Sequence, residues 1–247
     1  MIAITFALAT ESSAFLRRVG KKTSKSHNGV TTVCGWIKNK EIVILHTGVG
    51  EKICRYRLEN LLQETGFTFL IGSGFAGAVR EDLQVGDLIL AENFSDPQLL
   101  SVAQRILKNR AVHTAKLFTS KTIIDSLPER SAMAQRYRAA AVDMETEIIT
   151  NACLARGIPL LSLRVISDTS TENLPAPPNV LFDVKKQKTS FLKLSLYLLK
   201  HPNANRLFRF ARQIRFAREN LADSLITLLQ SELVNPQGAA VSKPPTK

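Results

Sequence analysis

The sequence predicts an α/β domain, and three observations support this. Apolar segments rich in β-branched residues alternate with amphipathic segments from residue 1 to about 170, the rhythm of βαβ units around a mainly parallel sheet. Two apolar segments end in carboxylates, Asp143 and Asp168, at the strand end where α/β proteins form ligand crevices. Of the 247 residues, 45% are hydrophobic, enough for a sizeable core. These features favour an enzyme that acts on a small polar ligand.

The hydrophobic periodicity predicts the elements in chain order. Strands are expected over residues 2–8, 30–37, 41–46, 67–71, 87–91, 115–119, 139–142 and 160–166. Helices are expected over residues 11–19, 51–64, 96–108, 128–137 and 145–156, and the last of these is followed by Gly157 and Pro159. After a proline-containing loop over 169–183, further helices are expected over 190–199 and 205–229.

The formal net charge of +12 comes mainly from one segment. Residues 184–218 contain no Asp or Glu. The basic residues there are Lys185, Lys186, Lys188, Lys193, Lys200, Arg206, Arg209, Arg212, Arg215 and Arg218. Such a segment indicates an anionic membrane surface, a nucleic acid, or only a solvated helix face. Because no recognised nucleic-acid-binding module accompanies the charge, we expect no specific nucleic-acid partner.

The cysteines and the amino terminus indicate a cytoplasmic protein. The three cysteines, which lack disulfide or zinc-site spacing, are Cys34, Cys54 and Cys153. Residues 1–9 are apolar, but no Lys or Arg precedes them and Glu11 follows too early for a membrane span. We therefore expect a buried first strand, a reducing compartment and no signal peptide.

Two glycine-rich segments follow predicted strands. Residues 72–79 and 47–50 each fit a tight turn, or a place where backbone approaches a ligand. The carboxylates are also open to two interpretations, as groups that bind a ligand or as groups that stabilise a helix. Asp143 and Glu145 suit a helix N-terminus, and Asp168 suits an N-cap. A metal site built from Asp143, Glu145 and Glu147 lacks a His or further acidic cluster to complete it. We expect no metal.

Four motifs occur together and in the order found in one family. They are Gly74-Phe75-Ala76-Gly77-Ala78-Val79, Val85-Gly86-Asp87-Leu88, Val142-Asp143-Met144-Glu145 and Arg164-Val165-Ile166-Ser167-Asp168. Over residues 1 to about 170 the chain resembles the purine nucleoside phosphorylase and nucleosidase superfamily, which includes methylthioadenosine/S-adenosylhomocysteine nucleosidase. The resemblance implies a three-layer α/β/α sandwich with a central mixed sheet, cleavage of a nucleoside's N-glycosidic bond, and no cofactor.

The same resemblance implies a role for each site residue. Asp168, with Ser167 beside it, would bind the purine and donate a proton at N7, and Glu145 would hold the ribose hydroxyls. The sugar and nucleophile side would be lined by Met144, Asp143, Phe75, Ala76, Gly77 and Gly48. Protonation lets the base leave as a neutral molecule, and a positioned acid commonly contributes about 10²- to 10⁴-fold.

The chain departs from the family at the nucleophile side. Phosphorylases hold phosphate with an Arg and a Ser or Thr, where this chain has Gly72 and Phe75. Hydrolysis is therefore favoured over phosphorolysis, which stays open if phosphate binds elsewhere. The position of the nucleosidases' water-activating Glu aligns with Ser13, so Glu11, two residues earlier, is the candidate base. A non-catalytic nucleoside-binding or membrane-associated protein remains the third alternative.

The carboxy-terminal segment bears on the domain division and on the group attached to the sugar of the substrate. Residues 1–183 would form the catalytic domain, 184–234 a basic helical extension on or beside it, and 235–247 a disordered tail. The chain resembles the hopanoid-associated branch, whose substrate adenosylhopane is lipid-linked. Along residues 205–229 an apolar stripe is expected from Leu207, Phe210, Ala211, Ile214, Ala217 and Leu221. The basic face of residues 185–218 would either lie in solvent or contact anionic lipid at the inner membrane face, and we expect a homo-oligomer.

Overall fold

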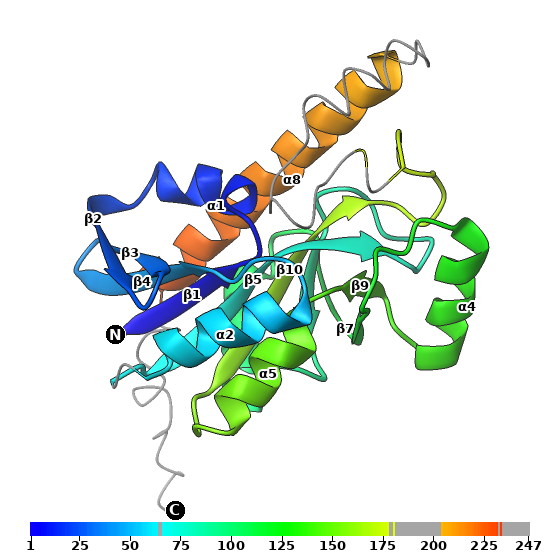
Figure 1. Cartoon of the computed structure of the whole chain (residues 1–247). Coiled ribbons are helices and arrows are strands. Elements are labelled where there is room, and N and C mark those ends of the chain that lie inside the picture. The colour runs from blue at the N-terminus through cyan, green and yellow to red at the C-terminus, as the bar shows by residue number, and fades with distance from the viewer. Residues whose placement is uncertain (64–65, 178–179, 181–203, 232, 234–247) are drawn as a thin grey trace, which may run out of the picture.

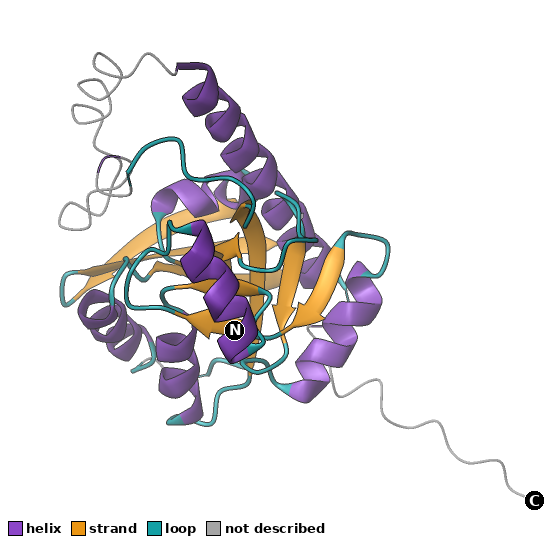
Figure 2. Cartoon of the chain, turned by 90° about the vertical axis from the view of Figure 1, so that its right-hand side faces the viewer, coloured by secondary structure: helices purple, strands orange, loops and turns teal. Residues whose placement is uncertain are grey.

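The protein is a three-layer sandwich in which helices cover both faces of a central mixed sheet (Figures 1 and 2). The structure is a computed structural model that describes residues 1–63, 66–177, 180, 204–231 and 233. The predicted helix over 190–199, the predicted tail over 235–247 and the lysines of the basic segment lie outside the described residues. The three-layer architecture predicted from the family resemblance is confirmed.

The sheet runs in the order β2-β3-β4-β1-β5-β10-β6-β7, with β9 paired to β5 and β8 paired to β9. The bounds of the strands are β1 Ile2–Phe6, β2 Gly20–His27, β3 Val30–Ile37, β4 Lys40–His46, β5 Phe69–Ala78, β6 Leu88–Ala91, β7 Val112–Ala115, β8 Leu117–Thr119, β9 Ala141–Asp143 and β10 Leu160–Asp168. The central strands β4, β1, β5 and β10 are mutually parallel, whereas β2, β3 and β4 form an antiparallel meander. The carboxyl ends of the parallel strands therefore meet at one edge, where the candidate site lies.

Two groups of helices bury the two faces of the sheet (Figure 1). Their bounds are α1 Ala9–Leu16, α2 Glu51–Leu61, α3 Pro97–Leu107, α4 Leu127–Tyr137, α5 Thr146–Leu154 and α8 Ala204–Gln230. The apolar side chains of α1, α3 and α8 share one core cluster with β1, and those of α2 and α5 share a second cluster on the other face. α3 begins at an N-cap where the Asp96 carboxylate accepts from two backbone N–H groups, as Asp commonly does there.

The carboxy-terminal half of α8 is part of the main hydrophobic core. Leu225, Leu228 and Leu229 are fully buried beneath the sheet with residues of α1 and α3. The amino-terminal half projects beyond the sandwich (Figure 1). In the predicted stripe Ala217 and Leu221 are buried, but Ala211 is exposed because this half of the helix leaves the sheet. No helix among the described residues has the length and apolarity needed to cross a membrane.

We predict that Leu225→Ala destabilises the whole domain. Leu225 has no exposed surface, and a buried Leu→Ala change typically costs about 2–5 kcal/mol in free energy of unfolding. The matched control is Leu154→Ala at the end of α5, where Leu154 is 72% exposed and a change within about 0.5 kcal/mol is expected. Urea unfolding measures both. Equal, small effects would contradict the placement of α8 in the core.

The sheet differs from the sequence-based expectations at four points. The strand β2 was missed because its side chains, from Gly20 to His27, are all exposed and show no apolar alternation. Of the two interpretations of the glycine-rich segment, the tight turn is excluded, since β5 continues through residues 72–78 in register with β10. The predicted strand over 115–119 is two strands that separate at Lys116. The periodicity predicted a mainly parallel sheet, but the sheet is mixed, as the family resemblance implied, and β6 pairs with β10 in the antiparallel direction.

Candidate active site

A cavity of about 270 Å³ opens at the carboxyl edge of the parallel strands. Its walls come from the ends of β1, β5, β9 and β10 and from the segments that follow them. The lining residues are Ala7, Leu8, Glu11, Val49, Phe75, Ala76, Gly77, Thr122, Ile123, Ile124, Arg130, Val142, Asp143, Met144, Glu145, Ser167, Asp168, Leu174 and Phe210. Three of the four sequence motifs contribute to this lining, and the motif over residues 85–88 does not.

Glu11 is the carboxylate that α1 presents to this cavity. Its oxygens accept from the backbone N–H of Leu8 at 3.1 Å and of Phe75 at 3.3 Å. Burial raises the pKa of Glu11, which makes its carboxylate a stronger base. Ser13, the position that aligned with the family's base, lies outside the cavity lining, and its hydroxyl donates to the Thr10 carbonyl.

Asp143 and Arg164 form a buried ion pair under the cavity floor. Arg164 lies 3.0 Å from Asp143 Oδ2 and also donates to Thr146 Oγ1 at 2.7 Å. The other oxygen of Asp143 accepts from Thr119 Oγ1 at 2.9 Å. Asp143 therefore lines the cavity with both oxygens already bonded to protein groups, and it anchors the start of α5.

Glu145 has an unused acceptor inside the cavity. Its side chain is buried, it accepts from the Gly50 N–H, and its Oε1 has no partner among the described residues. Burial, followed by the charges of Asp143 and Glu11, raises the pKa of Glu145 to about 8. A buried oxygen without a partner is costly, and so it marks a place where a ligand hydroxyl would be stabilised.

Glycine at position 74 lets the side chains of Arg164 and Glu11 approach the backbone of β5. A Cβ there would lie 2.9 Å from Arg164 Nη1 and 3.2 Å from Glu11 Oε2. Any larger residue would displace the guanidinium or the carboxylate. The glycine-rich segment therefore serves close packing within a strand, and the turn that the sequence also allowed does not form.

The raised pKa of Glu145 predicts that stability falls as pH rises. Between the ordinary value of 4.5 and the folded value of about 8, the folded protein keeps a proton that the unfolded chain has lost. The free energy of unfolding should therefore fall by up to about 1.4 kcal/mol per pH unit in this window. Glu145→Gln should flatten that slope in urea unfolding from pH 5 to 8, whereas the exposed neighbour variant Glu147→Gln should keep it. Parallel slopes in all three proteins would exclude this assignment.

Asp168 lies at the end of β10 with both oxygens engaged. Ser167 Oγ donates to Oδ1 at 2.6 Å, and Arg130 donates to Oδ2 at 2.5 Å. A Cβ at Gly77 would come within 3.1 Å of Oδ2, so glycine is needed where β5 passes this carboxylate. Gly74 beside Glu11 and Gly77 beside Asp168 are three strand residues apart, roughly 10 Å at about 3.3 Å per residue. The two carboxylates are thus spaced along β5 to meet different parts of one nucleoside-sized ligand.

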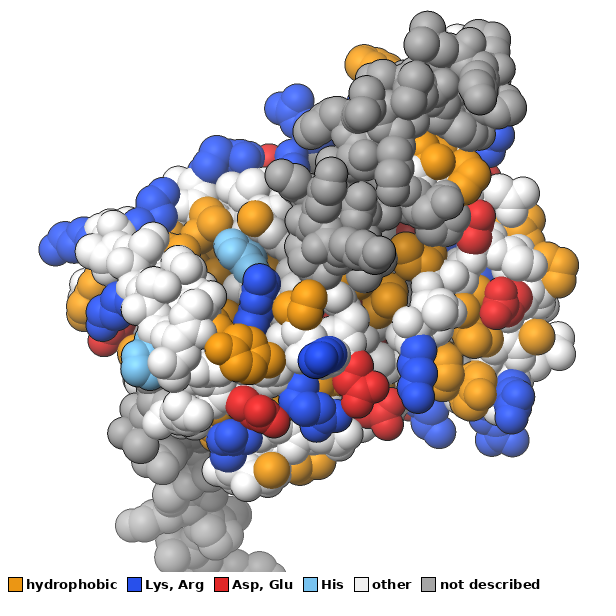
Figure 3. Space-filling model, in the orientation of Figure 1, with side chains coloured by type: hydrophobic (Ala, Val, Ile, Leu, Met, Phe, Trp, Pro, Cys, Tyr) orange, Lys and Arg blue, Asp and Glu red, His pale blue; other side chains and the backbone are white. Residues whose placement is uncertain are grey.

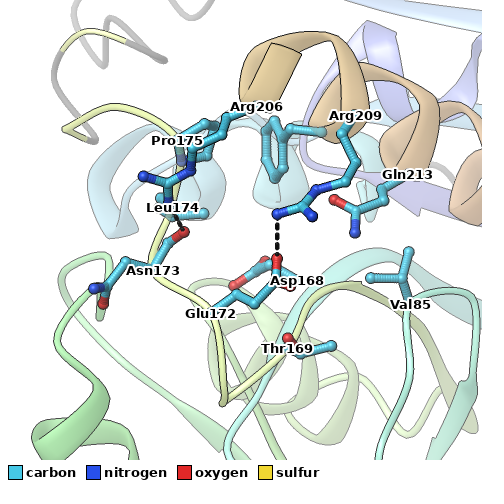
Figure 4. Close-up of a pocket in the computed structure, with 11 residues that line it drawn as sticks. Val85, Asp168, Thr169, Glu172, Asn173, Leu174, Pro175, Arg206, Arg209 and Gln213 are labelled. Carbon is cyan, nitrogen blue, oxygen red and sulfur yellow. Dashed lines mark hydrogen bonds and ion pairs between the residues drawn. The ribbon is translucent and has the colours of Figure 1, made fainter. Parts of the chain in front are cut away.

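A second, smaller pocket between α8 and the 172–175 segment shares Asp168, Leu174 and Phe210 with the cavity (Figure 4). Arg209 on α8 pairs with Glu172 at 3.1 Å, and Arg206 donates to the Asn173 carbonyl at 3.3 Å. Leu174 and Phe210 reach from these two segments into the cavity lining. Both ionic partners are exposed, so these contacts place the segment on α8 but contribute little to stability.

Most of the site residues named from the sequence meet in this cavity. Those that line it are Glu11, Phe75, Ala76, Gly77, Asp143, Met144, Glu145, Ser167 and Asp168. Gly48 does not line it: its N–H donates to Ala7 O and joins the ends of β1 and β4, and Val49 takes the wall position.

Sequence reasoning missed Arg130, Phe210 and the supporting role of Arg164. A charged residue in the apolar run of β10 was the available signal for Arg164. The described residues contain no group of His, Cys, Asp and Glu suited to hold a metal ion.

Comparison with known proteins assigns the chain to one family. The family model described as "Phosphorylase superfamily" matches residues 1–96 and 91–200. The chain belongs to the phosphorylase superfamily. Among curated relatives of this superfamily, the 5′-methylthioadenosine/S-adenosylhomocysteine nucleosidase of Buchnera aphidicola is 24% identical, covering 89% of this chain and 95% of its own. The corresponding protein of Staphylococcus epidermidis is 21% identical over 68% of this chain and 86% of its own.

Solved structures from the superfamily share the architecture. The 5′-methylthioadenosine/S-adenosyl homocysteine nucleosidase of Campylobacter jejuni has a TM-score of 0.71 at 17% identity, covering 93% of this chain and 98% of that one. Futalosine hydrolase of Helicobacter pylori has a TM-score of 0.70 at 17% identity, covering 93% and 97%. At these identities the structural likeness establishes the fold.

Proposed function

We propose that this protein hydrolyses the N-glycosidic bond of a purine nucleoside and releases the base, with adenine as the expected base and a 5′-substituted ribose as the sugar. The observation that carries the proposal is one cavity lined by two buried carboxyl groups, Glu11 and Glu145, and by Asp168. We assign the first two to the sugar and Asp168 to the base. The relatives named as 5′-methylthioadenosine/S-adenosylhomocysteine nucleosidases support this substrate class.

Each residue then has a chemical task. Glu145 accepts a hydrogen bond from a ribose hydroxyl through its open oxygen, and Met144 packs against the sugar. Glu11 takes a proton from water as its oxygen bonds to C1′ of the ribose. The electron pair of the C1′–N9 bond moves to the purine, which receives at N7 the proton that Asp168 carries in its acid form. Glu11 ends protonated and Asp168 ends ionised, and proton exchange with solvent restores both. Burial of Glu11 suits it to this task, because a base whose pKa is raised toward neutral pH accepts a proton more readily.

The charge around the nucleophile side favours water over phosphate as the attacking group. Phosphate is an anion, and the cavity wall where it would bind holds the Glu11 carboxylate and Glu145, whose raised pKa leaves it mainly protonated at neutral pH, so neither residue offers a positive charge. Arg164, the nearby cation, is already paired with Asp143 and bonded to Thr146. Phe75 lines the cavity and offers no side-chain donor.

Adenine release from 5′-methylthioadenosine, S-adenosylhomocysteine and adenosine tests the proposal. We expect free adenine at the same rate with and without phosphate, detected by separation of the base from the nucleoside. A strict phosphate requirement would support the phosphorylase alternative instead. Binding of these nucleosides without turnover would favour a non-catalytic binding protein.

We also propose a membrane contact, for a substrate whose 5′-substituent is lipid-linked. Phe208, Arg212 and Phe216 share one face of α8, and the two rings are 69% and 55% exposed. Apolar rings between arginines fit the interface of an anionic membrane, such as its cytoplasmic face. On the face seen in Figure 3 the other Lys and Arg side chains are dispersed with acidic ones between them, rather than gathered in one groove.

Co-sedimentation with phosphatidylglycerol-containing vesicles tests this contact. Wild type should bind, and Phe208→Ser/Phe216→Ser should bind at least tenfold less. Leu154→Ser, which removes an exposed apolar side chain elsewhere, is the control. Equal binding by the double variant and the control would refute the contact. We expect a homo-oligomer as well, and sedimentation velocity with these same proteins tests it.

A further inference from the structure

Arg130 is a buried cation that the proposed reaction has not yet used. It lies on α4, is 2% exposed and lines the cavity. Its guanidinium donates to three backbone carbonyls: Nε to Ile124 at 3.0 Å, and Nη1 to Thr169 at 2.8 Å and Ala78 at 3.4 Å. These anchors fix the plane of the guanidinium independently of Asp168. A side chain held in this way is pre-organised to orient whatever its remaining N–H groups contact.

The contact that remains is with Asp168. Arg130 Nη2 donates to Asp168 Oδ2 at 2.5 Å, while Ser167 donates to Oδ1. The carboxyl is therefore held from two sides, and the backbone of Gly77 packs against it, since a Cβ there would meet both Oδ2 and Arg130 Cζ. Little freedom is left for rotation of the Asp168 side chain.

We propose that Arg130 is the positioning residue for Asp168, holding its carboxyl in the plane in which it meets the purine. This inference rests on the proposed function, in which Asp168 is the group that binds the base. Because a misplacement of about 1 Å can cost on the order of 10²-fold in rate, an anchored guanidinium at this point matters for catalysis. α4 thereby becomes part of the site, although the sequence of the helix indicated only a covering element.

The test compares Arg130→Met, Arg130→Lys and the control Arg136→Met, an exposed arginine further along α4. Adenosine hydrolysis by Arg130→Met should fall by about 10²-fold. Hydrolysis of 4-nitrophenyl β-D-ribofuranoside should fall less than tenfold, because that leaving group departs without a proton. Arg130→Lys should restore part of the loss, and Arg136→Met should behave as wild type. Urea unfolding gives the folded fraction of each variant, and the rates are compared per folded molecule. If Arg130→Met does not fold, Arg130→Lys carries the same comparison of the two substrates.

A double-variant cycle decides whether Arg130 acts through Asp168. The variant Arg130→Met/Asp168→Asn should hydrolyse adenosine no more slowly than Asp168→Asn alone. Additive losses, or equal losses on both substrates, would overturn the inference. Calorimetric titration with adenine separates this result from failure of the proposed function. If wild type binds adenine without hydrolysing nucleosides, weaker adenine binding by Arg130→Met still supports positioning, and unchanged binding refutes it.

Discussion

Asp168→Asn is expected to lower the rate of adenine release by about 10²- to 10⁴-fold while the nucleoside still binds. The amide keeps an oxygen that accepts from Arg130 or Ser167, but it has no proton to deliver to N7. The proposed sugar contacts, Glu145 and Met144, are unchanged by this substitution. We therefore expect the loss in kcat, measured with adenosine under saturating conditions.

The matched control for this substitution is Asp96→Asn. Asp96 caps α3 outside the cavity, and Asn is an equally good N-cap residue. This variant should keep wild-type activity and stability. An Asp168→Asn protein that remains folded and works within tenfold of wild type would remove Asp168 from the leaving-group role.

Glu11→Gln is expected to produce the second large loss, also about 10²- to 10⁴-fold in kcat. A glutamine side chain cannot accept the proton of the attacking water. It also accepts through one oxygen only, whereas Glu11 accepts from both Leu8 N–H and Phe75 N–H. One buried N–H is left without a partner, so the free energy of unfolding should fall by about 1–3 kcal/mol.

Ser13→Ala separates the two candidate positions for the water-activating group. Ser13 lies on the same helix, but its hydroxyl bonds to Thr10 O outside the cavity. We expect activity within twofold of wild type after correction for the folded fraction, measured by urea unfolding. A large loss in Ser13→Ala together with an active Glu11→Gln would reverse the assignment.

The position of the site was predictable because short motifs carry it. Asp143, Glu145 and Asp168 follow or end apolar strands, and parallel strands bring their carboxyl ends to one edge. At residues 72–78 the glycines left two interpretations open, a tight turn or a close approach of backbone to a ligand. Those glycines instead leave room for Arg164, Glu11 and Asp168 beside an unbroken strand. A sequence shows a glycine but not the side chain that needs its space.

The parts of the site that could not be predicted depend on contacts between distant segments. Arg130 is one of several charged residues on an amphipathic helix, and nothing local marks it as the one that reaches Asp168, 38 residues away. Phe210 enters the cavity because α8 is anchored by its buried carboxy-terminal half and projects past the sheet edge. The strand β2 was missed because its own sequence carries no strand signal, since an exposed edge strand needs no apolar pattern.

The central claim is that water attacks the ribose within this cavity. Hydrolysis of adenosine in H₂¹⁸O, with millimolar inorganic phosphate present, tests it directly by mass spectrometry of the sugar product. The account predicts free ribose with one ¹⁸O at C1 and no dependence on phosphate. Ribose 1-phosphate as the product, with unlabelled C1 oxygen, would contradict it.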